Sequence, residues 1–170
     1  MNSATNYTHI LIRVPNWLGD SLMASPVVSA IHKVFPTSKI SVLAKPNMIP
    51  FWRGFSEVHE VLELEKGLDG IIRTISEIKK RKFDAALILP TSFSSAFLLF
   101  AADIPVRAGW GREGREIFLT RAVPAPEPRG KHLVWEYLEL MREGLGRPTA
   151  QKTVQLAFPI DPKTRKDAQK

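Results

Sequence analysis

The stretch from Ile10 to Pro26, ILIRVPNWLGDSLMASP, constrains the fold of this chain more than any other segment. Residues 9–14 are mostly apolar and rich in β-branched side chains, which predicts a strand buried on both faces, as in a parallel sheet. A short turn, PNWLGD, follows, and apolar residues then recur at helical spacing as far as Phe35. The stretch therefore predicts a strand, a tight turn and a helix, which form the first unit of an α/β fold.

The same alternation of strand and helix continues to residue 158. Further strands are predicted over residues 39–44, 58–64, 84–89, 106–110 and 154–158, and helices over residues 68–82, 92–102 and 131–146. Residues 116–123 favour a strand or an ordered loop, and Pro26 either kinks one long helix, which we prefer, or begins a second helix capped by Ser25. We predict a Rossmann-like, doubly wound, mostly parallel α/β sheet over residues 1–158 and a charged linker over residues 159–170.

Length and composition exclude several classes of site and partner. With 170 residues, of which 44% are hydrophobic, the chain fits one domain, and the absence of cysteine excludes disulfides and thiolate metal sites. Its 4 histidines lack metal-ligand spacing, and we predict neither a metal site nor a bound cofactor. The formal charge of +7 predicts attraction to nucleic acid, a membrane surface, or a phosphorylated or carboxylated substrate. No basic helix, zinc module or aromatic RNA-binding motif accompanies that charge, so a nucleic-acid partner is not expected.

Ligands of doubly wound sheets bind beyond the carboxyl ends of the strands, so the turns at that edge are the candidate site. Five basic residues in or beside those turns predict a basic mouth over the sheet: Lys45, Arg53, Arg112, Arg115 and Arg121. Guanidinium groups suit carboxylate and phosphate oxygens, although any single surface arginine is more often simply solvated. The G-x-G-x-x-G pattern at residues 109–114 follows the fifth strand and opens no helix, so we interpret it as an exposed loop that matches the dinucleotide motif by coincidence.

Asp20, in the turn between the first strand and the first helix, has two interpretations. As a helix N-cap it would accept backbone N–H bonds and contribute about 1 kcal/mol, which is the commoner role of an aspartate at such a turn. As a catalytic group it would accept a proton from a hydroxyl nucleophile within hydrogen-bond distance. Its apolar neighbours Trp17 and Leu18 and its place at the ligand edge raise the odds of catalysis, but from the residues alone both roles stay open, with capping ahead.

Three segments of the chain, taken in order, resemble a known family. VPNWLGDSLMASP, LPTSFSSAFLLFAADIPVRAGWGREGR and KHLVWEYLELM are similar to the N-terminal half of the ADP-heptose:lipopolysaccharide heptosyltransferases, glycosyltransferase family 9. The similarity runs from Ile10 to about Phe158. Within the family, the type II enzymes, which add the second heptose of the inner core, resemble the chain more than types I and III do.

The resemblance implies a GT-B fold, in which an N-terminal acceptor domain faces a C-terminal donor domain across a cleft. It implies inverting, metal-independent transfer, with Asp20 of the G-D pair as the general base. It also implies that basic and polar side chains near the cleft hold an acidic acceptor, the lipopolysaccharide inner core. The substrate-binding residues that we predict are Trp17, Lys45, Arg53, Ser92, Ser95, Arg112, Arg115 and His132.

A full member of the family continues through a second domain of similar size, so we expect this chain to be part of such a protein and inactive in transfer alone. Its expected partners are the inner-core acceptor and its own C-terminal domain, which would hold ADP-heptose. We expect a cytoplasmic location with peripheral contact to the anionic surface of the inner membrane. The alternative is a non-catalytic module that binds an anionic glycolipid or oligosaccharide, and a weaker one is a nucleotide-binding domain.

Overall fold

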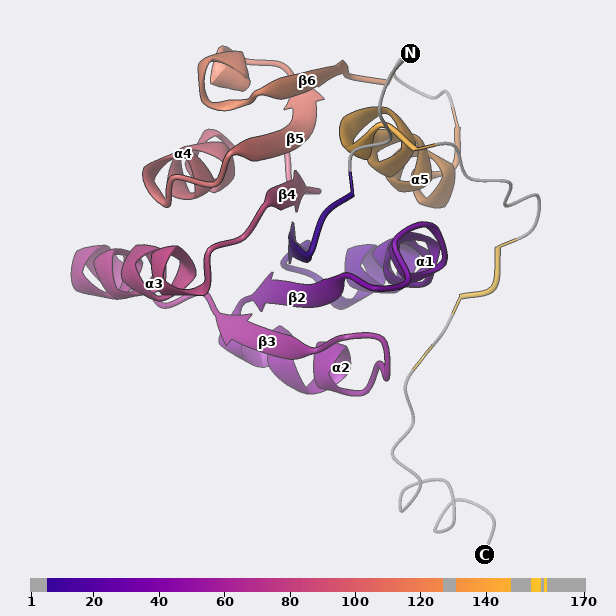
Figure 1. Cartoon of the computed structure of the whole chain (residues 1–170), viewed down its shortest axis with the longest axis horizontal. Helices are drawn as coiled ribbons and strands as arrows, with labels where there is room; N and C mark the ends of the chain where they lie inside the picture. The colour runs from indigo at the N-terminus through magenta and orange to yellow at the C-terminus, as the bar shows by residue number, and fades with distance from the viewer. Residues whose placement is uncertain (1–5, 127–130, 148–153, 157, 159–170) are drawn as a thin grey trace, which may run out of the picture.

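The computed structural model describes residues 6–126, 131–147, 154–156 and 158, and its centre is a 6-stranded parallel sheet (Figure 1). The strands are β1 (His9–Arg13), β2 (Lys39–Ala44), β3 (Glu60–Glu63), β4 (Ala85–Ile88), β5 (Val106–Gly111) and β6 (Arg121–Pro124). They lie in the order β3-β2-β1-β4-β5-β6, and every pair is parallel. This is the strand order of a Rossmann sheet, so the predicted doubly wound α/β fold is confirmed.

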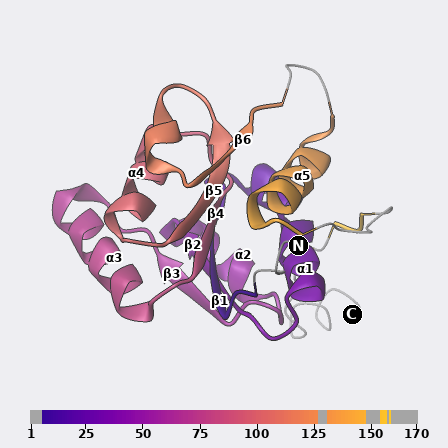
Figure 2. The ribbon, with the colours of Figure 1, turned by 45° about the horizontal axis from the view of Figure 1, so that its top comes forward.

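Helices cover both faces of the sheet, as Figures 1 and 2 show. The helices are α1 (Leu18–Val34), α2 (Ile49–Arg53), α3 (Gly67–Arg81), α4 (Phe93–Ala101) and α5 (Leu133–Leu145), with 3-10 turns η1 (Pro46–Met48) and η2 (Arg115–Phe118). Helices α1 and α5 pack side by side on one face, and α3 and α4 on the other. Because side chains alternate along a strand, Ile10 and Ile12 of β1 enter the core under α1 and α5, whereas Leu11 enters the core under α3 and α4. None of the helices in the described residues has the length and apolar character needed to cross a membrane.

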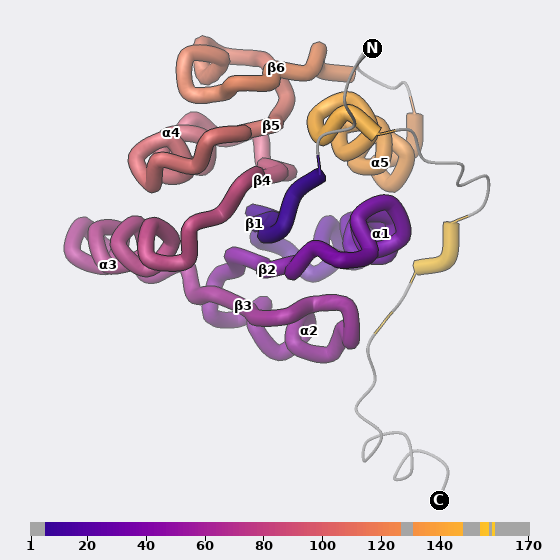
Figure 3. The backbone as a smooth tube through the Cα atoms, in the orientation of Figure 1, coloured from indigo at the N-terminus to yellow at the C-terminus, as the bar shows by residue number. Residues whose placement is uncertain are grey.

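The path of the chain, traced in Figure 3, creates a switch point beside β1. From β1 the chain proceeds outward through β2 to β3, then returns to β4 on the other side of β1 and proceeds outward again to β6. The connections after β1 and β4 therefore leave in opposite directions. A crevice opens between these connections, beyond the carboxyl ends of the two strands. Doubly wound sheets bind ligands at such a point.

Proline ends the central ladder at this switch point and directs the chain into the predicted turn. The Val14 N–H donates to the Leu43 carbonyl at 3.3 Å, and the Leu89 N–H donates to the Arg13 carbonyl at 3.1 Å, so β1 is held on both sides to its end. Pro15 has no N–H with which to continue the ladder. The Ser21 hydroxyl then donates to the Pro15 carbonyl at 3.3 Å, which ties the turn to the first turn of α1.

Helix α1 runs without interruption through Pro26, so the preferred single helix is confirmed and a second start at Ser25 is wrong. Pro26 lacks the N–H that would bond to the carbonyl of Leu22 one turn earlier. The Ser25 hydroxyl donates to that carbonyl at 2.8 Å and so satisfies the acceptor that proline leaves free.

Two other predictions near the end of the chain are settled by the structure. Residues 116–123, predicted as a strand or an ordered loop, contain most of η2 and the beginning of β6. The strand predicted over residues 154–158 is wrong, because residues 154–156 and 158 belong to no strand. In the described residues β3 and β6 are the edges of the sheet, and no further strand pairs with either of them. The predicted linker, residues 159–170, lies outside the described residues.

Gly144 allows α5 to approach β5 closely, which makes a test of the packing possible. A Cβ at Gly144 would lie 2.6 Å from the Cβ of Ala108, whereas a Cβ at Gly19, in the first turn of α1, would meet nothing within 4 Å. We expect Gly144→Ala to lower the free energy of unfolding by about 1–3 kcal/mol because of this clash. The matched control, Gly19→Ala, changes only helix propensity and should be neutral or slightly stabilising. An unchanged melting temperature for Gly144→Ala would contradict the close contact.

Candidate functional site

A cavity of ≈ 330 Å³ opens at the switch point, beyond the carboxyl ends of β1, β4 and β5. Five parts of the chain contribute its walls: the turn before α1 with the first turn of that helix, the segment after β4, the end of β5 with the residue after it, the segment after β6, and the beginning of α5. The lining residues are Pro15, Asn16, Trp17, Asp20, Leu89, Pro90, Thr91, Ser92, Trp110, Arg112, Pro126, Leu133, Glu136 and Tyr137. This is the edge at which the sequence predicted a ligand site.

Asp20 lies half-buried in the wall of this cavity and is not the cap of α1. The N-cap residue is Trp17, without a side-chain capping bond, and Asp20 lies in the first turn of the helix. Among the described residues, no hydrogen bond or ion pair engages the Asp20 carboxylate. The positive end of the helix dipole stabilises its negative charge. The carboxylate is therefore free to accept a proton or a hydrogen bond from a molecule in the cavity.

Helix α5 brings a second carboxylate and a phenol to the same cavity. Tyr137 is buried, and its burial raises the pKa of the phenol, with the negative charges of Asp20 and Glu136 acting in the same direction. Tyr137 therefore remains a neutral O–H group beside Asp20 at physiological pH. Sequence reasoning missed Glu136 and Tyr137 because they belong to a helix that reaches Asp20 only through the packing of α1 on α5.

Arg13 supports the turn that carries Asp20. Its side chain is only 3% exposed, and burial lowers the pKa of the guanidinium to about 10. One nitrogen, Nη2, donates to the Asn16 side-chain oxygen at 2.7 Å, and Nη1 donates to the Val14 carbonyl. Arg13 was not predicted as a site residue, because it stands inside a strand whose other residues are mostly apolar.

Arg115 departs from its predicted place in an exposed loop, because its side chain is fully buried. Its Nη1 donates to the carbonyls of Pro90, at 2.6 Å, and Ser92, at 3.3 Å. Its Nε and Nη2 have no hydrogen-bond partner in the described residues, and burial lowers the pKa of the group. A Cβ at Gly109 would lie 2.8 Å from Nη2, so glycine leaves the room that this side chain occupies. Arg115 thus supports the segment that lines the cavity rather than offering its charge to a ligand.

The basic mouth predicted from five residues is not assembled, because Arg112 alone of the five lines the cavity. Arg121 donates to the Gly144 carbonyl at 3.0 Å, and Lys45 and Arg53 belong to the segment after β2. Closeness to a strand end in the sequence did not predict which basic side chains reach the cavity. The loop after β5 exposes Arg112 but buries Arg115.

Of the other predicted binding residues, two line the cavity and two do not. Trp17 and Ser92 line the cavity, and Trp17 is 75% exposed. Ser95 is buried below, with its hydroxyl 2.7 Å from that of Ser92. His132 caps α5, where its Nδ1 accepts from the Val134 N–H at 3.4 Å. In the part of the chain that the structure describes, no three His, Asp or Glu side chains gather as a group that would hold a metal ion.

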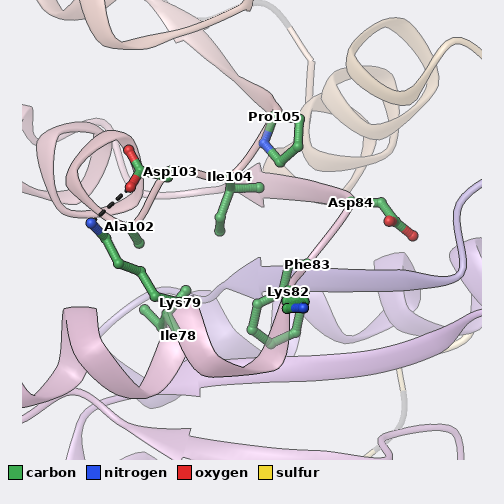
Figure 4. Close-up of a pocket in the computed structure, with 9 residues that line it drawn as sticks. All are labelled: Ile78, Lys79, Lys82, Phe83, Asp84, Ala102, Asp103, Ile104 and Pro105. Carbon is green, nitrogen blue, oxygen red and sulfur yellow. Dashed lines mark ion pairs between the residues drawn. The ribbon is translucent and has the colours of Figure 1, made fainter.

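A second cavity, of ≈ 380 Å³, lies between the ends of α3 and α4 and the beginnings of β4 and β5 (Figure 4). Three of its charged groups, Lys79, Asp84 and Asp103, already have protein partners. Lys79 pairs with Asp103 at 2.7 Å across the cavity. The Asp84 carboxylate accepts from the Thr8 N–H and hydroxyl, both at 2.6 Å, and from the His9 N–H at 2.9 Å. These contacts join the beginning of β1 to that of β4 and indicate a structural role.

We expect Asp84→Asn to flatten the acid sensitivity of folding. Partial burial alone would raise the pKa of Asp84, but the hydrogen bonds from Thr8 and His9 outweigh it and hold the pKa below 3.8. The carboxylate therefore stabilises the fold above that pH, and the stabilisation is lost as the pH falls through the folded-state pKa. Melting temperatures from about pH 6 down to about pH 3 should fall less steeply in Asp84→Asn than in the unchanged chain. Asp69→Asn, at an exposed site in α3, is the control, and identical slopes for all three proteins would contradict this role.

Comparisons with known proteins agree on one family. Residues 71–170 match the profile described as glycosyltransferase family 9 (heptosyltransferase). Lipooligosaccharide heptosyltransferase 2 of Haemophilus ducreyi is 33% identical over 65% of this chain and 33% of its own length. Lipopolysaccharide heptosyltransferase 2 of Salmonella typhimurium is 31% identical over 62% of this chain and 32% of its own length. The chain thus matches about a third of the length of these relatives.

Solved structures show the same fold over most of this chain. The Escherichia coli ADP-heptose LPS heptosyltransferase II matches with a TM-score of 0.75 and 26% identity, over 92% of this chain and 48% of that one. A family 9 glycosyl transferase of Veillonella parvula matches with a TM-score of 0.81 and 19% identity, over 98% of this chain and 49% of that one. The second likeness concerns the fold alone. In both, the matched part is about half of the solved chain.

Proposed function

Since this chain belongs to glycosyltransferase family 9, the heptosyltransferases, we propose that it is the acceptor-binding half of an enzyme that moves heptose from ADP-heptose to the lipopolysaccharide inner core. The relatives that it matches are named for heptose transfer to lipopolysaccharide or lipooligosaccharide. The observation that carries the proposal is the free Asp20 carboxylate in a cavity at the switch point of the sheet.

Asp20 acts in this proposal as the general base. An acceptor hydroxyl lies against the carboxylate, which takes the proton while the hydroxyl oxygen attacks the anomeric carbon of ADP-heptose. The bond from that carbon to the ADP oxygen breaks as the new bond forms, and ADP leaves with the electron pair. Attack from the side opposite to ADP inverts the configuration, and neither a protein nucleophile nor a metal ion takes part. General-base catalysis of this kind contributes roughly 10²–10⁴-fold.

The remaining cavity residues hold the acceptor. Trp17 offers an exposed ring, on which a sugar can stack, and Ser92 offers a hydroxyl at the cavity wall. Arg112 supplies a positive charge for the phosphates or carboxylates of the inner core. Donor binding belongs to a second domain across the cavity, which accords with the match to about half of the solved chains. The chain works at the cytoplasmic face of the inner membrane, where its acceptor is anchored.

Asp20→Asn tests the general base in the full-length enzyme. We expect kcat to fall roughly 10²–10⁴-fold, since the amide cannot take the proton, while the melting temperature stays nearly unchanged because Asp20 makes no capping bond. Asp69→Asn is the matched control, since Asp69 also lies in the first turn of a helix but not at the cavity. Turnover is measured as ADP release with purified core acceptor. Near-normal turnover of Asp20→Asn would exclude the base assignment.

Arg112→Gln tests the recognition of an anionic acceptor. Removing one exposed charge at the cavity should weaken binding of core oligosaccharide several-fold to about tenfold and reduce the dependence of affinity on salt. Titration calorimetry at low and high salt measures both quantities. Arg73→Gln removes another exposed arginine, from α3 and outside the cavity, and should leave binding unchanged. If both variants bind like the unchanged chain, Arg112 does not contact the acceptor.

A non-catalytic module for an anionic glycolipid gives a different outcome in the same experiments. It binds the oligosaccharide with the same dependence on Arg112, but the full-length protein releases no ADP, and Asp20→Asn changes nothing beyond binding.

A further inference from the structure

Five large apolar side chains form a surface on α4 and η2 that protein atoms leave uncovered. We call the surface made by Phe93, Phe97, Phe100, Ile117 and Phe118 the aromatic ridge. Phe118 lies at its centre, with ring centroids at 4.9 Å from Phe93, 5.4 Å from Phe97 and 5.3 Å from Phe100. The three α4 rings therefore have a fixed arrangement, and the ridge is preformed.

The aromatic ridge exposes several large apolar side chains that lie next to one another. Phe93 is 52% exposed, Phe97 46%, Phe100 43% and Ile117 73%. Scattered apolar residues on a surface need no explanation, but a contiguous group of aromatic rings marks a place where something binds. Helix α4 buries its other side against the sheet through residues such as Ser95 and Leu99, so the ridge is the side that the fold leaves over.

The ridge is continuous with the cavity at one end. Phe93 directly follows Ser92, which lines the cavity, so α4 begins at the cavity wall and extends away from it. The loop that presents Arg112 to the cavity continues into η2, which carries Ile117 and Phe118. A partner on the ridge is therefore adjacent to a molecule bound at Asp20.

Basic side chains border the other end of the ridge. The Arg107 guanidinium carbon lies 5.4 Å from the ring centroid of Phe100. Asp103, just beyond α4, pairs with Lys79 of α3, which brings the end of α3 beside the end of α4 (Figures 1 and 4). That end of α3 carries the four consecutive basic residues Lys79–Lys82, of which Lys79, Lys80 and Arg81 pair with carboxylates. Aromatic rings flanked by basic residues complement an apolar layer beneath anionic headgroups.

We propose that the aromatic ridge docks the chain on a bilayer surface that contains anionic phospholipid, an inference that rests on the proposed function. The acceptor of the proposed reaction is anchored in such a bilayer by its lipid part, and its sugars must reach Asp20. With the ridge in the interfacial layer, the cavity opens beside the headgroups, where those sugars lie. The basic end of α3 favours anionic lipid over a second copy of this chain, which carries the same positive charge of +7.

A single-cysteine label tests whether the ridge enters the bilayer. The chain has no cysteine, so Ile117→Cys and Lys33→Cys each provide one labelling site, on the ridge and on α1 of the opposite face. A polarity-sensitive dye at residue 117 should shift to the blue and brighten with vesicles of phosphatidylethanolamine and phosphatidylglycerol, and the dye at residue 33 should not. A chain that binds these vesicles with residue 117 still in water, or one that does not bind them, would overturn the proposal.

Paired substitutions measure how much the ridge contributes to binding. Phe97→Ser with Phe100→Ser should lower the vesicle partition coefficient at least roughly tenfold, since two rings no longer leave water. Trp135→Ser removes an exposed ring of α5 on the other face and should have no effect. Circular dichroism establishes that each variant is folded. If the ridge variant binds vesicles normally but loses a dimer seen by gel filtration, a second copy covers the ridge and the membrane assignment is wrong.

The two proposals fail separately. Calorimetry with deacylated core oligosaccharide reports on the cavity alone, because this soluble acceptor needs no bilayer. Loss of vesicle binding with normal oligosaccharide binding overturns the docking surface only. Vesicle binding at the ridge without any oligosaccharide binding overturns the proposed function, and with it the reason that we give for docking.

Discussion

The pairing of β1 with a parallel strand on each side is the interaction on which the rest of this structure depends. Residues His9 to Arg13 pair with β2 along their whole length, and Ile10 to Arg13 also pair with β4. The ladder is complete to its last residue and then stops at Pro15, which cannot donate a hydrogen bond. The turn that follows is consequently fixed at the one edge where the connections of β1 and β4 separate. Asp20 owes its place in the cavity to this arrangement.

Buried guanidinium groups support the cavity wall from beneath. Arg13 holds the turn before α1 through Asn16, and Arg115 holds the segment after β4 through the carbonyls of Pro90 and Ser92. Burying a charge without a carboxylate partner costs free energy, and burial accordingly lowers the pKa of both groups. The fold accepts this cost in free energy at the carboxyl edge of the sheet, where both arginines support residues that line the cavity. The consequence for recognition is that the arginines of these loops do not all contribute charge to the surface.

The two sides of α4 differ in composition, since one packs on the sheet and the other is exposed. Its buried side is made of small and aliphatic residues, which allow close packing on the sheet, and its other side carries three phenylalanines. Because the helix begins at the cavity wall, its exposed side extends the cavity into an apolar surface. Helix α3 shows a related feature, since Gly70, Thr74 and Ile78 face the core while Leu68 is 76% exposed.

Local pattern was enough to predict most of the fold. Runs of β-branched residues and apolar residues at helical spacing located β1, β2, β4, β5 and the long helices, because these periodicities reflect the geometry of strand and helix themselves. The doubly wound order followed from the alternation and the right-handed crossover. The helix at α3 was predicted correctly, but its apolar residues do not all face the core: Ile78 is buried, whereas Leu68 and Ile72 are exposed. The strand over residues 154–158 was wrong although β3 and β6 leave free edges in the described part of the sheet, because a short apolar run does not by itself specify a strand pairing.

By itself, the sequence determined that this chain folds as a doubly wound α/β sheet, and its motifs pointed to the family and to Asp20. Only the tertiary structure decided that Asp20 is not a cap, that Arg115 is buried while Arg112 is exposed, and that Glu136 and Tyr137 reach the same cavity. The physical reason is that periodicity is a property of neighbouring residues. Burial and proximity depend on which helix packs against which strand, and here α5 meets α1 more than 100 residues further along the chain.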